Sequence, residues 1–204
     1  LISGTGIRQV AQWVRRASEV RFQIREANEW FTSSLRYGDS RTERASGLHV
    51  STLALPPGGV ALLRVMSDWG RMQWLNRMRA FKFFAAIEAV NFQKAPLIVA
   101  IVGPTGPAAS FDAGRCLQRV WLKATELGLS AQPFYVVTDL LNRLESNGLP
   151  EHCVSGAKGL RARVHAQFGS GNAVHCLLRI GKPIKDIAVS GRLPLNEIMC
   201  DRGG

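Results

Sequence analysis

The side chains best suited to metal binding are histidines and cysteines in the second half of the chain. None of their spacings matches a paired-ligand zinc knuckle or the His-x-x-x-His pattern of one helix face. Successive residues of a strand point to opposite faces, so the neighbours His175 and Cys176 are not expected to share an ion. The sequence therefore predicts no metal site among the six candidates, which are His152, Cys153, His165, His175, Cys176 and Cys200.

A cysteine could also act as a nucleophile, which requires a depressed thiol pKa and a nearby base. The four cysteines lie in apolar periodic segments rather than in a loop-rich cysteine framework, and Cys116 takes a core position of its expected helix. This placement is typical of reduced, buried thiols in a cytoplasmic protein. We expect no disulfide and no catalytic side chain.

Two glycine-rich segments invite comparison with phosphate-binding loops: Ser3-Gly4-Thr5-Gly6 and Gly103-Pro104-Thr105-Gly106-Pro107. Neither ends in the Lys-Ser/Thr pair that grips nucleotide phosphates and magnesium. In the second segment, two prolines remove backbone N–H donors that a phosphate cradle needs. We interpret this segment as a turn from a strand into a helix.

The chain carries 26 basic and 15 acidic residues, which gives a formal net charge of +11. Such a charge allows an acidic partner, either a phosphorylated cofactor or a nucleic acid. The arginines are scattered through helical patterns and are interrupted by acidic residues, and no basic run or groove-reading motif appears. A nucleic-acid partner is therefore disfavoured, and a phosphorylated cofactor remains open.

A length of 204 residues with 46% hydrophobic residues is typical of a globular protein with one core. The longest apolar run, residues 95–102, is far shorter than the roughly 18–20 residues that a membrane-spanning helix needs. An integral membrane protein is therefore excluded. The chain begins without Met or a signal-peptide apolar stretch, so we expect that an upstream segment has been removed.

Apolar periodicity predicts the elements that would position these residues. Helical spacing covers 7–31 as one long helix, about 60–90 with a break near 68–70, then 112–127, a run up to 144, and 151–168. Unbroken apolar runs at 97–102 and 174–180 predict buried strands, and residues 49–53 allow a short one. This order predicts an α+β domain with helices packed on a small central sheet, in which the two runs are neighbouring central strands under the helix at 112–127.

Three features occur in the order found in FMN-dependent nitroreductases. They are a helix beginning Ala113-Gly114-Arg115, the turn Gly128-Leu129-Ser130-Ala131-Gln132-Pro133, and a tail with Arg192-Leu193-Pro194-Leu195. The chain thus resembles the C-terminal half of that family, in particular divergent members sometimes joined to ubiquitin-activating-enzyme-like adenylating domains. The resemblance is clearest from residue 97 to residue 195. It implies a single nitroreductase-like domain over residues 1–204.

The resemblance also implies a cofactor and a reaction. In nitroreductases the turn after this helix lies against the flavin ring through backbone atoms, which here corresponds to Gln132, Pro133 and Phe134. A tail arginine holds the FMN phosphate, which corresponds to Arg192. The implied activity is FMN-dependent oxidation of NAD(P)H, with a nitroaromatic, quinone or similar small-molecule acceptor, in a homodimer.

The N-terminal signatures of the family find no counterpart here. Neither an Arg-Ser-x-Arg motif that grips FMN nor the Asn/Gln-Pro-Trp turn that follows it can be placed, and Arg15-Arg16-Ala17-Ser18 lies inside the expected first helix. The chain is therefore expected to lack the usual N-terminal FMN-binding segment. The alternative function is a flavin-free remnant of the fold that acts as a binding or interaction module.

Overall fold

The computed structural model describes residues 1–38, 47–53, 55 and 57–184 of the chain. These residues form two compact units. The first combines Leu1–Ile24 with Trp74–Ile184, and the described part of the second is 25–73. Whether the whole chain behaves as one domain stays a prediction.

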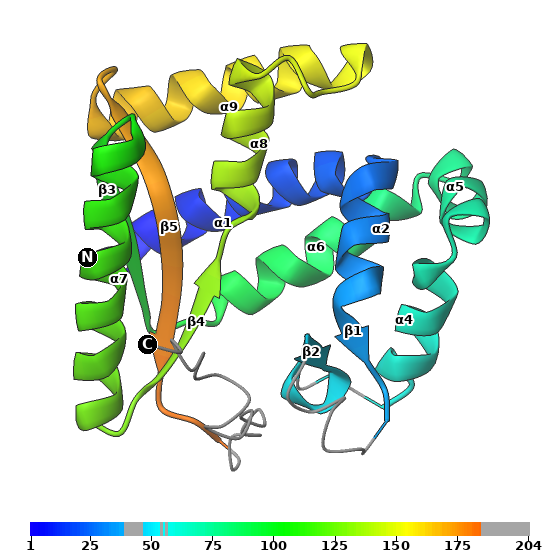
Figure 1. Ribbon diagram of the computed structural model, residues 1–204, viewed down its shortest axis with the longest axis horizontal. Coiled ribbons are helices and arrows are strands. Elements are labelled where there is room, and N and C mark those ends of the chain that lie inside the picture. Colours follow the sequence, from blue (N-terminus) through cyan, green and yellow to red (C-terminus); the bar gives the residue numbers. More distant parts are fainter. Residues whose placement is uncertain (39–46, 54, 56, 185–204) are drawn as a thin grey trace, which may run out of the picture. The chain divides into compact units, whose positions relative to one another are not determined.

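The first unit is built on an antiparallel sheet of three strands, β3 (Leu97–Pro104), β4 (Ser130–Phe134) and β5 (Asn172–Gly181). Their order is β3-β5-β4, so β5 is central (Figure 1). The prediction that 97–102 and 174–180 pair is confirmed. The prediction that both are central is wrong for β3. Among the described residues, Ile2 alone pairs with its outer edge, through two hydrogen bonds of 2.8 and 3.0 Å to Ile98.

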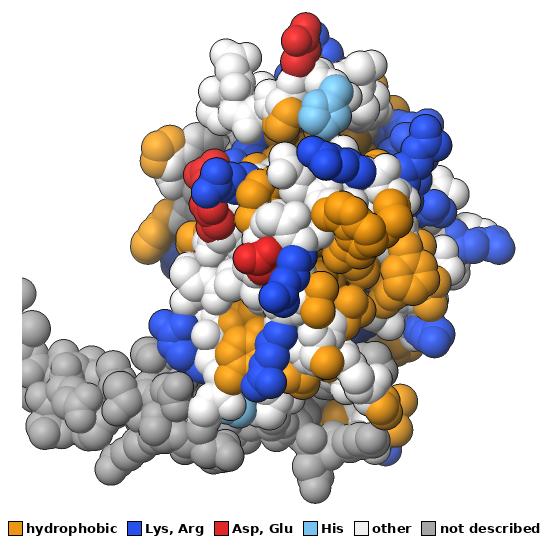
Figure 2. Space-filling model, turned by 90° about the vertical axis from the view of Figure 1, so that its right-hand side faces the viewer, with side chains coloured by type: hydrophobic (Ala, Val, Ile, Leu, Met, Phe, Trp, Pro, Cys, Tyr) orange, Lys and Arg blue, Asp and Glu red, His pale blue; other side chains and the backbone are white. Residues whose placement is uncertain are grey.

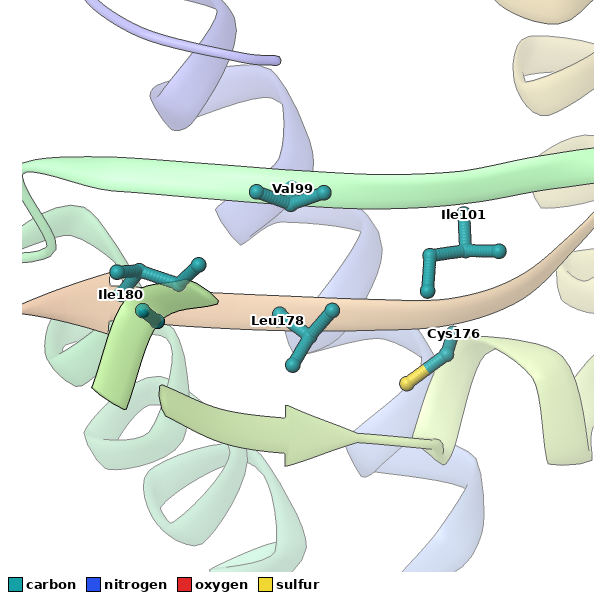
Figure 3. Packing of buried hydrophobic residues seen from close by; sticks show 6 residues of the cluster. Val99, Ile101, Cys176, Leu178 and Ile180 are labelled. Carbon is teal, nitrogen blue, oxygen red and sulfur yellow. The ribbon is translucent and has the colours of Figure 1, made fainter. Parts of the chain in front are cut away.

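Both faces of β3 are buried, as its unbroken β-branched run predicts. Ile98 is fully buried on one face, while Val99 and Ile101 belong to a cluster on the other. Figure 3 shows Val99 and Ile101 on β3 beside a row of side chains on β5, from Cys176 to Ile180. The sheet therefore has a packed layer on each side.

Helix α7 (Pro107–Glu126) covers one of these faces. Its inward residues Ala113, Leu117, Val120 and Ala124 pack against the cluster on β3 and β5, as predicted. The helix begins five residues before the expected Asp112, because Pro107 is suited to the first helical position, where no N–H is needed. It ends before Gly128, whose φ of +66° favours glycine.

Four helices pack together as the other part of this unit: α1 (Thr5–Arg21), α6 (Ala80–Gln93), α8 (Val136–Glu145) and α9 (Glu151–Phe168). Helix α1 contacts the other three, and α8 and α9 contact β5 (Figure 1). The buried Ser18 and the partly buried Arg21 of α1 both donate hydrogen bonds to the Glu88 carboxylate of α6. This polar contact fixes α1 against α6.

The expected single helix over 7–31 is wrong. Helix α1 stops at Arg21, and α2 (Arg25–Ser34) starts after a short break. At the break, the Phe22 and Gln23 N–H groups are bonded to carbonyls near the end of α1, and Asn76 Nδ2 donates to the Phe22 carbonyl at 2.7 Å. In a continuous helix the Phe22 carbonyl would accept a backbone N–H four residues later. Here it accepts a hydrogen bond from the side chain of the distant Asn76 instead.

The described part of the second unit contains α2, β1 (Leu35–Arg36), β2 (Leu48–His49), the 3₁₀ helix η1 (Val50–Leu53) and α4 (Gly59–Ser67). Strands β1 and β2 pair in parallel. Helix α5 (Trp69–Arg77) begins in this unit and ends in the first. The expected strand at 49–53 is therefore mostly 3₁₀ helix, while the expected break near 68–70 is confirmed at Asp68, whose carboxylate accepts the Arg71 N–H.

The described residues thus form a mixed α+β structure that is mostly helical, as predicted. In that part of the chain, no helix has the length and apolar character needed to cross a membrane.

Candidate functional site: a pocket beside the open edge of β5

A pocket of about 430 Å³ lies in the first unit beside the end of β4. Strand β4 pairs with β5 only from Leu177 to Gly181, because it ends at Phe134. The preceding residues of β5, 173–176, line the pocket instead. The pocket volume is within the range of sites that bind small organic ligands.

Helix α7 and the glycine before it contribute one wall of the pocket, in which Leu117 stands beside smaller residues. Gly106, Ala113 and Gly114 line the pocket, and a Cβ atom added at Gly106 or Gly114 would meet no other atom within 4 Å. Gly106 has a φ of +118°, a conformation that other residues rarely adopt. The part of this wall at Gly106 and Gly114 is therefore open, and a flat ligand could lie against it.

Polar side chains from α8 and the residue before it line the opposite side. Thr138 Oγ1 donates a 2.7 Å hydrogen bond to the Val174 carbonyl on the open edge of β5. Asn142 Nδ2 donates to the Tyr135 hydroxyl at 3.0 Å, so the Tyr135 O–H remains available as a donor. These contacts hold the pocket's polar groups in defined positions.

A β-bulge in β5 brings His175 and Cys176 to the same side of the sheet. Ile101 pairs with Cys176 and Val102 pairs with Val174, so His175 is an extra residue with no partner on β3. Side chains alternate along β3, so Gly103 faces α7, as Val99 and Ile101 do. A Cβ atom added at Gly103 would lie 3.7 Å from His175 Nε2, so the imidazole is on this face too. The expectation that the two residues face opposite ways is therefore wrong, and both line the pocket.

The imidazole of His175 has a defined tautomer in its neutral state. Its Nε2 lies 2.9 Å from the Pro104 carbonyl oxygen. A carbonyl oxygen only accepts hydrogen bonds, so Nε2 carries the proton. In the neutral ring Nδ1 is consequently an acceptor.

The Cys176 thiol does not have the properties of a nucleophile. Burial raises its pKa, and a hydrogen bond involving the Phe134 backbone opposes this only in part. Burial also raises the pKa of the Cys153 thiol. Cys116 was expected in the core but is exposed, because α7 turns that position away from the sheet, and Cys200 lies outside the described residues. Within the described ranges, no group of three or more His, Cys, Asp or Glu side chains could hold a metal ion.

The segment that was expected to form a turn against a flavin is a strand. Gln132, Pro133 and Phe134 belong to β4, and the turn lies earlier, around Gly128. Pro133 is tolerated because β4 is an edge strand, where one missing N–H need not break a ladder. Only Pro133 of the three lines the pocket, whereas the Phe134 ring packs on Phe92 at 4.7 Å between ring centroids.

The charges around the pocket suit a ring better than a phosphate. Among the described residues that line it, none is Lys or Arg, and Glu145 is the acidic one. Elsewhere on the surface, Figure 2 shows basic side chains scattered among hydrophobic and polar ones rather than gathered in a single patch. Arg192, the expected phosphate ligand, lies outside the described residues.

Sequence reasoning missed the polar residues of this pocket, namely Tyr135, Thr138, Asn142 and the acceptor role of His175. The helical pattern before 144 predicts α8 but not what its exposed residues face. No protein-family model, curated protein or solved structure matches this chain. The resemblance to nitroreductases therefore depends on the residues quoted for it.

Proposed function

We propose that this chain is a nitroreductase-like flavoprotein, an FMN-dependent NAD(P)H oxidoreductase that acts on a nitroaromatic, quinone or similar acceptor. One observation carries the proposal: Ala113 and Gly114 of α7 line the same pocket as Pro133 of β4. These residues come from two of the three segments on which the resemblance is based. Segments separated along the chain thus meet at one pocket of suitable size.

The residues present fit the ring part of FMN. The open wall at Gly106 and Gly114 leaves room for a planar ring, and Pro133 would bound the ring from β4. Tyr135 and Asn142 would offer hydrogen bonds at its polar edge. Arg192 is proposed to hold the phosphate, since a guanidinium forms paired, charge-assisted hydrogen bonds with phosphate oxygens.

Bound FMN would supply the hydride chemistry between NAD(P)H and the acceptor. The protein would then need to bind and orient the ring, and its side chains next to the ring should not react with a bound molecule. The protonated, buried thiol of Cys176 is suited to this role, because it packs against the ring site without attacking a bound molecule.

The test fills the pocket at Gly114. Gly114→Leu should raise the Kd for FMN about tenfold or more, because the leucine side chain would occupy the space of the ring. Gly156→Leu on α9 is the matched control: Gly156 is also an exposed helical glycine with nothing near its Cβ. Both changes raise helix propensity by a similar amount, so only the pocket differs.

Binding is measured by titrating FMN and following the quenching of its fluorescence, beside an absorption spectrum of the purified chain. Wild-type protein that is colourless and binds no added FMN would contradict the proposal. Equal weakening by Gly114→Leu and Gly156→Leu would show that FMN binds elsewhere.

A flavin-free binding module is the second candidate function, and the absence of Lys and Arg from the described pocket lining favours it. Such a module would take an uncharged ligand. Titration with FMN and with riboflavin, which lacks the phosphate, separates the two functions: the flavoprotein should bind FMN more tightly than riboflavin, whereas the flavin-free module should bind neither.

We also propose that the chain forms a homodimer. Phe83, Ile87 and Val90 form an exposed apolar stripe along α6, on the side opposite the residues that pack on α1. Exposed apolar stripes of this kind often mark contacts between subunits.

A further inference from the structure

We propose that His175 determines which ring edge the pocket accepts, because its Nδ1 accepts a hydrogen bond from a ring N–H of the bound flavin. This assignment rests on the proposed function and specifies the ligand chemistry of the same pocket. It concerns a side chain that the resemblance to nitroreductases does not include.

The β-bulge is the first reason for this assignment. Without the extra residue, His175 would point to the face of the sheet opposite α7. The bulge turns the imidazole toward Gly103, where an added Cβ would lie in ordinary van der Waals contact with the ring. Bulges often occur beside binding sites because they redirect a side chain without ending the strand.

The tautomer is the second reason. The Pro104 carbonyl holds the Nε2 proton at 2.9 Å and orients the ring. No hydrogen bond from a described residue occupies Nδ1, and Nδ1 is not enclosed away from solvent. The ring therefore presents a fixed acceptor in a pocket that it lines.

The surrounding groups complement an imide edge, in which an N–H stands between two carbonyls. His175 Nδ1 would accept from the N–H, while the Tyr135 hydroxyl is free to donate to a carbonyl. The other titratable groups that line the pocket are Glu145, which also accepts hydrogen bonds, and Cys176, whose buried thiol stays protonated. The isoalloxazine ring of a flavin carries such an imide edge.

The experiment compares lumiflavin with 3-methyllumiflavin, in which a methyl group replaces the imide hydrogen. Wild-type protein should bind lumiflavin about 3- to 10-fold more tightly, as expected for one hydrogen bond. The ratio should fall below about twofold in His175→Phe, which keeps a ring but has no acceptor. His175→Gln, whose amide can both donate to Pro104 and accept from the ligand, should retain part of the preference.

The outcomes separate this assignment from the proposed function. Equal binding of the two flavins by the wild-type chain overturns the assignment and leaves the flavin site intact, and this comparison needs no variant to fold. A preference that persists in His175→Phe shows that the methyl group is rejected sterically, which also overturns it. If the wild-type chain binds neither of these flavins nor FMN, the proposed function fails and the assignment fails with it. If it binds FMN but neither lumiflavin, the assignment alone is overturned.

Discussion

At the scale of single residues, burial decides which cysteines and polar groups can react. Cys153 and Cys176 lie in similar apolar patterns to Cys116, yet only the first two are buried. Loss of hydration disfavours the thiolate and raises the pKa of both buried thiols. The sequence pattern placed all three cysteines among apolar residues. Such a position is buried only where another element packs on it, and none of the described elements buries Cys116.

Thiol labelling tests this difference. In a Cys200→Ser background, Cys116 should react with iodoacetamide at least about tenfold faster than Cys153 and Cys176 under native conditions, because reaction needs an accessible thiolate. The native state holds the two buried protons more tightly than the unfolded chain does. The two protonated thiols therefore contribute to the stability of the fold at pH values below the ordinary thiol pKa. That contribution is lost as the pH rises from the ordinary thiol pKa to the raised pKa of the folded state. Peptide mapping that found three equally fast thiols would contradict the burial of Cys153 and Cys176.

Arg192 carries a second prediction at this scale. Arg192→Ala should weaken FMN binding by about 1.5–3 kcal/mol, the amount expected for a charge-assisted contact with phosphate. Riboflavin is the control ligand, since it has no phosphate and its affinity should stay the same. Unchanged FMN affinity in a fluorescence titration would remove Arg192 from the site.

At the scale of elements, the sheet and the α1–α6 pair hold the first unit together. β5 pairs on both sides from Leu177 to Ile180 and contacts α7, α8 and α9. β3 pairs on one side and is nevertheless buried on both faces. A charged side chain introduced on either face of β3 would therefore be shielded from water.

Val99→Asp tests the burial of β3. The substitution should lower the free energy of unfolding by about 3–5 kcal/mol, because an unpaired carboxylate would be enclosed in the cluster on the α7 face. Leu122→Asp is the control, since Leu122 is 59% exposed on α7 and lies outside the α6 stripe, and it should cost about 0.5 kcal/mol or less. Urea denaturation curves that coincide for both variants would mean that Val99 lies outside the core.

Glu88→Ala tests the contact between α1 and α6. The change should cost about 1–3 kcal/mol, because it leaves the fully buried Ser18 hydroxyl and the Arg21 guanidinium without their acceptor. Glu126→Ala removes an exposed carboxylate that pairs with Lys123 and should cost less than about 0.5 kcal/mol. Thermal unfolding compares the two variants, and equal melting temperatures would show that the Glu88 contact adds no stability.

At the scale of the whole molecule, the exposed stripe on α6 and the charge of +11 act in opposite directions on self-association. Burial of Phe83, Ile87 and Val90 favours a dimer, while like charges on two copies repel each other. Salt screens this repulsion over distances of about 10 Å at 0.1 M. Dimerisation should consequently strengthen as salt is added.

Size-exclusion chromatography with light scattering measures the assembly. In 0.3 M salt the wild-type chain should have twice the chain mass of 22.4 kDa, and Phe83→Glu/Ile87→Glu should elute as a monomer. Leu122→Glu, at an exposed apolar position on α7, is the control and should remain dimeric. A wild-type monomer at every salt concentration would rule out the dimer.

The sequence by itself determined most of the elements and the α+β class. The β-branched run at 97–102 and the stripe on 112–127 are local patterns, and each is strong enough to specify a strand or a helix without its partners. The helices at 151–168 and before 144 were found in the same way. Of the residues quoted for the family resemblance, Ala113, Gly114 and Pro133 line the pocket, but the sequence predicted only Pro133 as a binding residue.

Tertiary structure alone decided the register, the break in the first helix and the composition of the pocket. The break at Phe22 depends on Asn76, 54 residues away, and β4 forms because Gln132-Pro133-Phe134 finds a partner in β5. His175 faces α7 only because one extra residue of β5 stands opposite β3. Periodicity reports how a segment distributes its own apolar residues, whereas pairing, register and bulges are set by contacts between distant segments, which no local pattern contains.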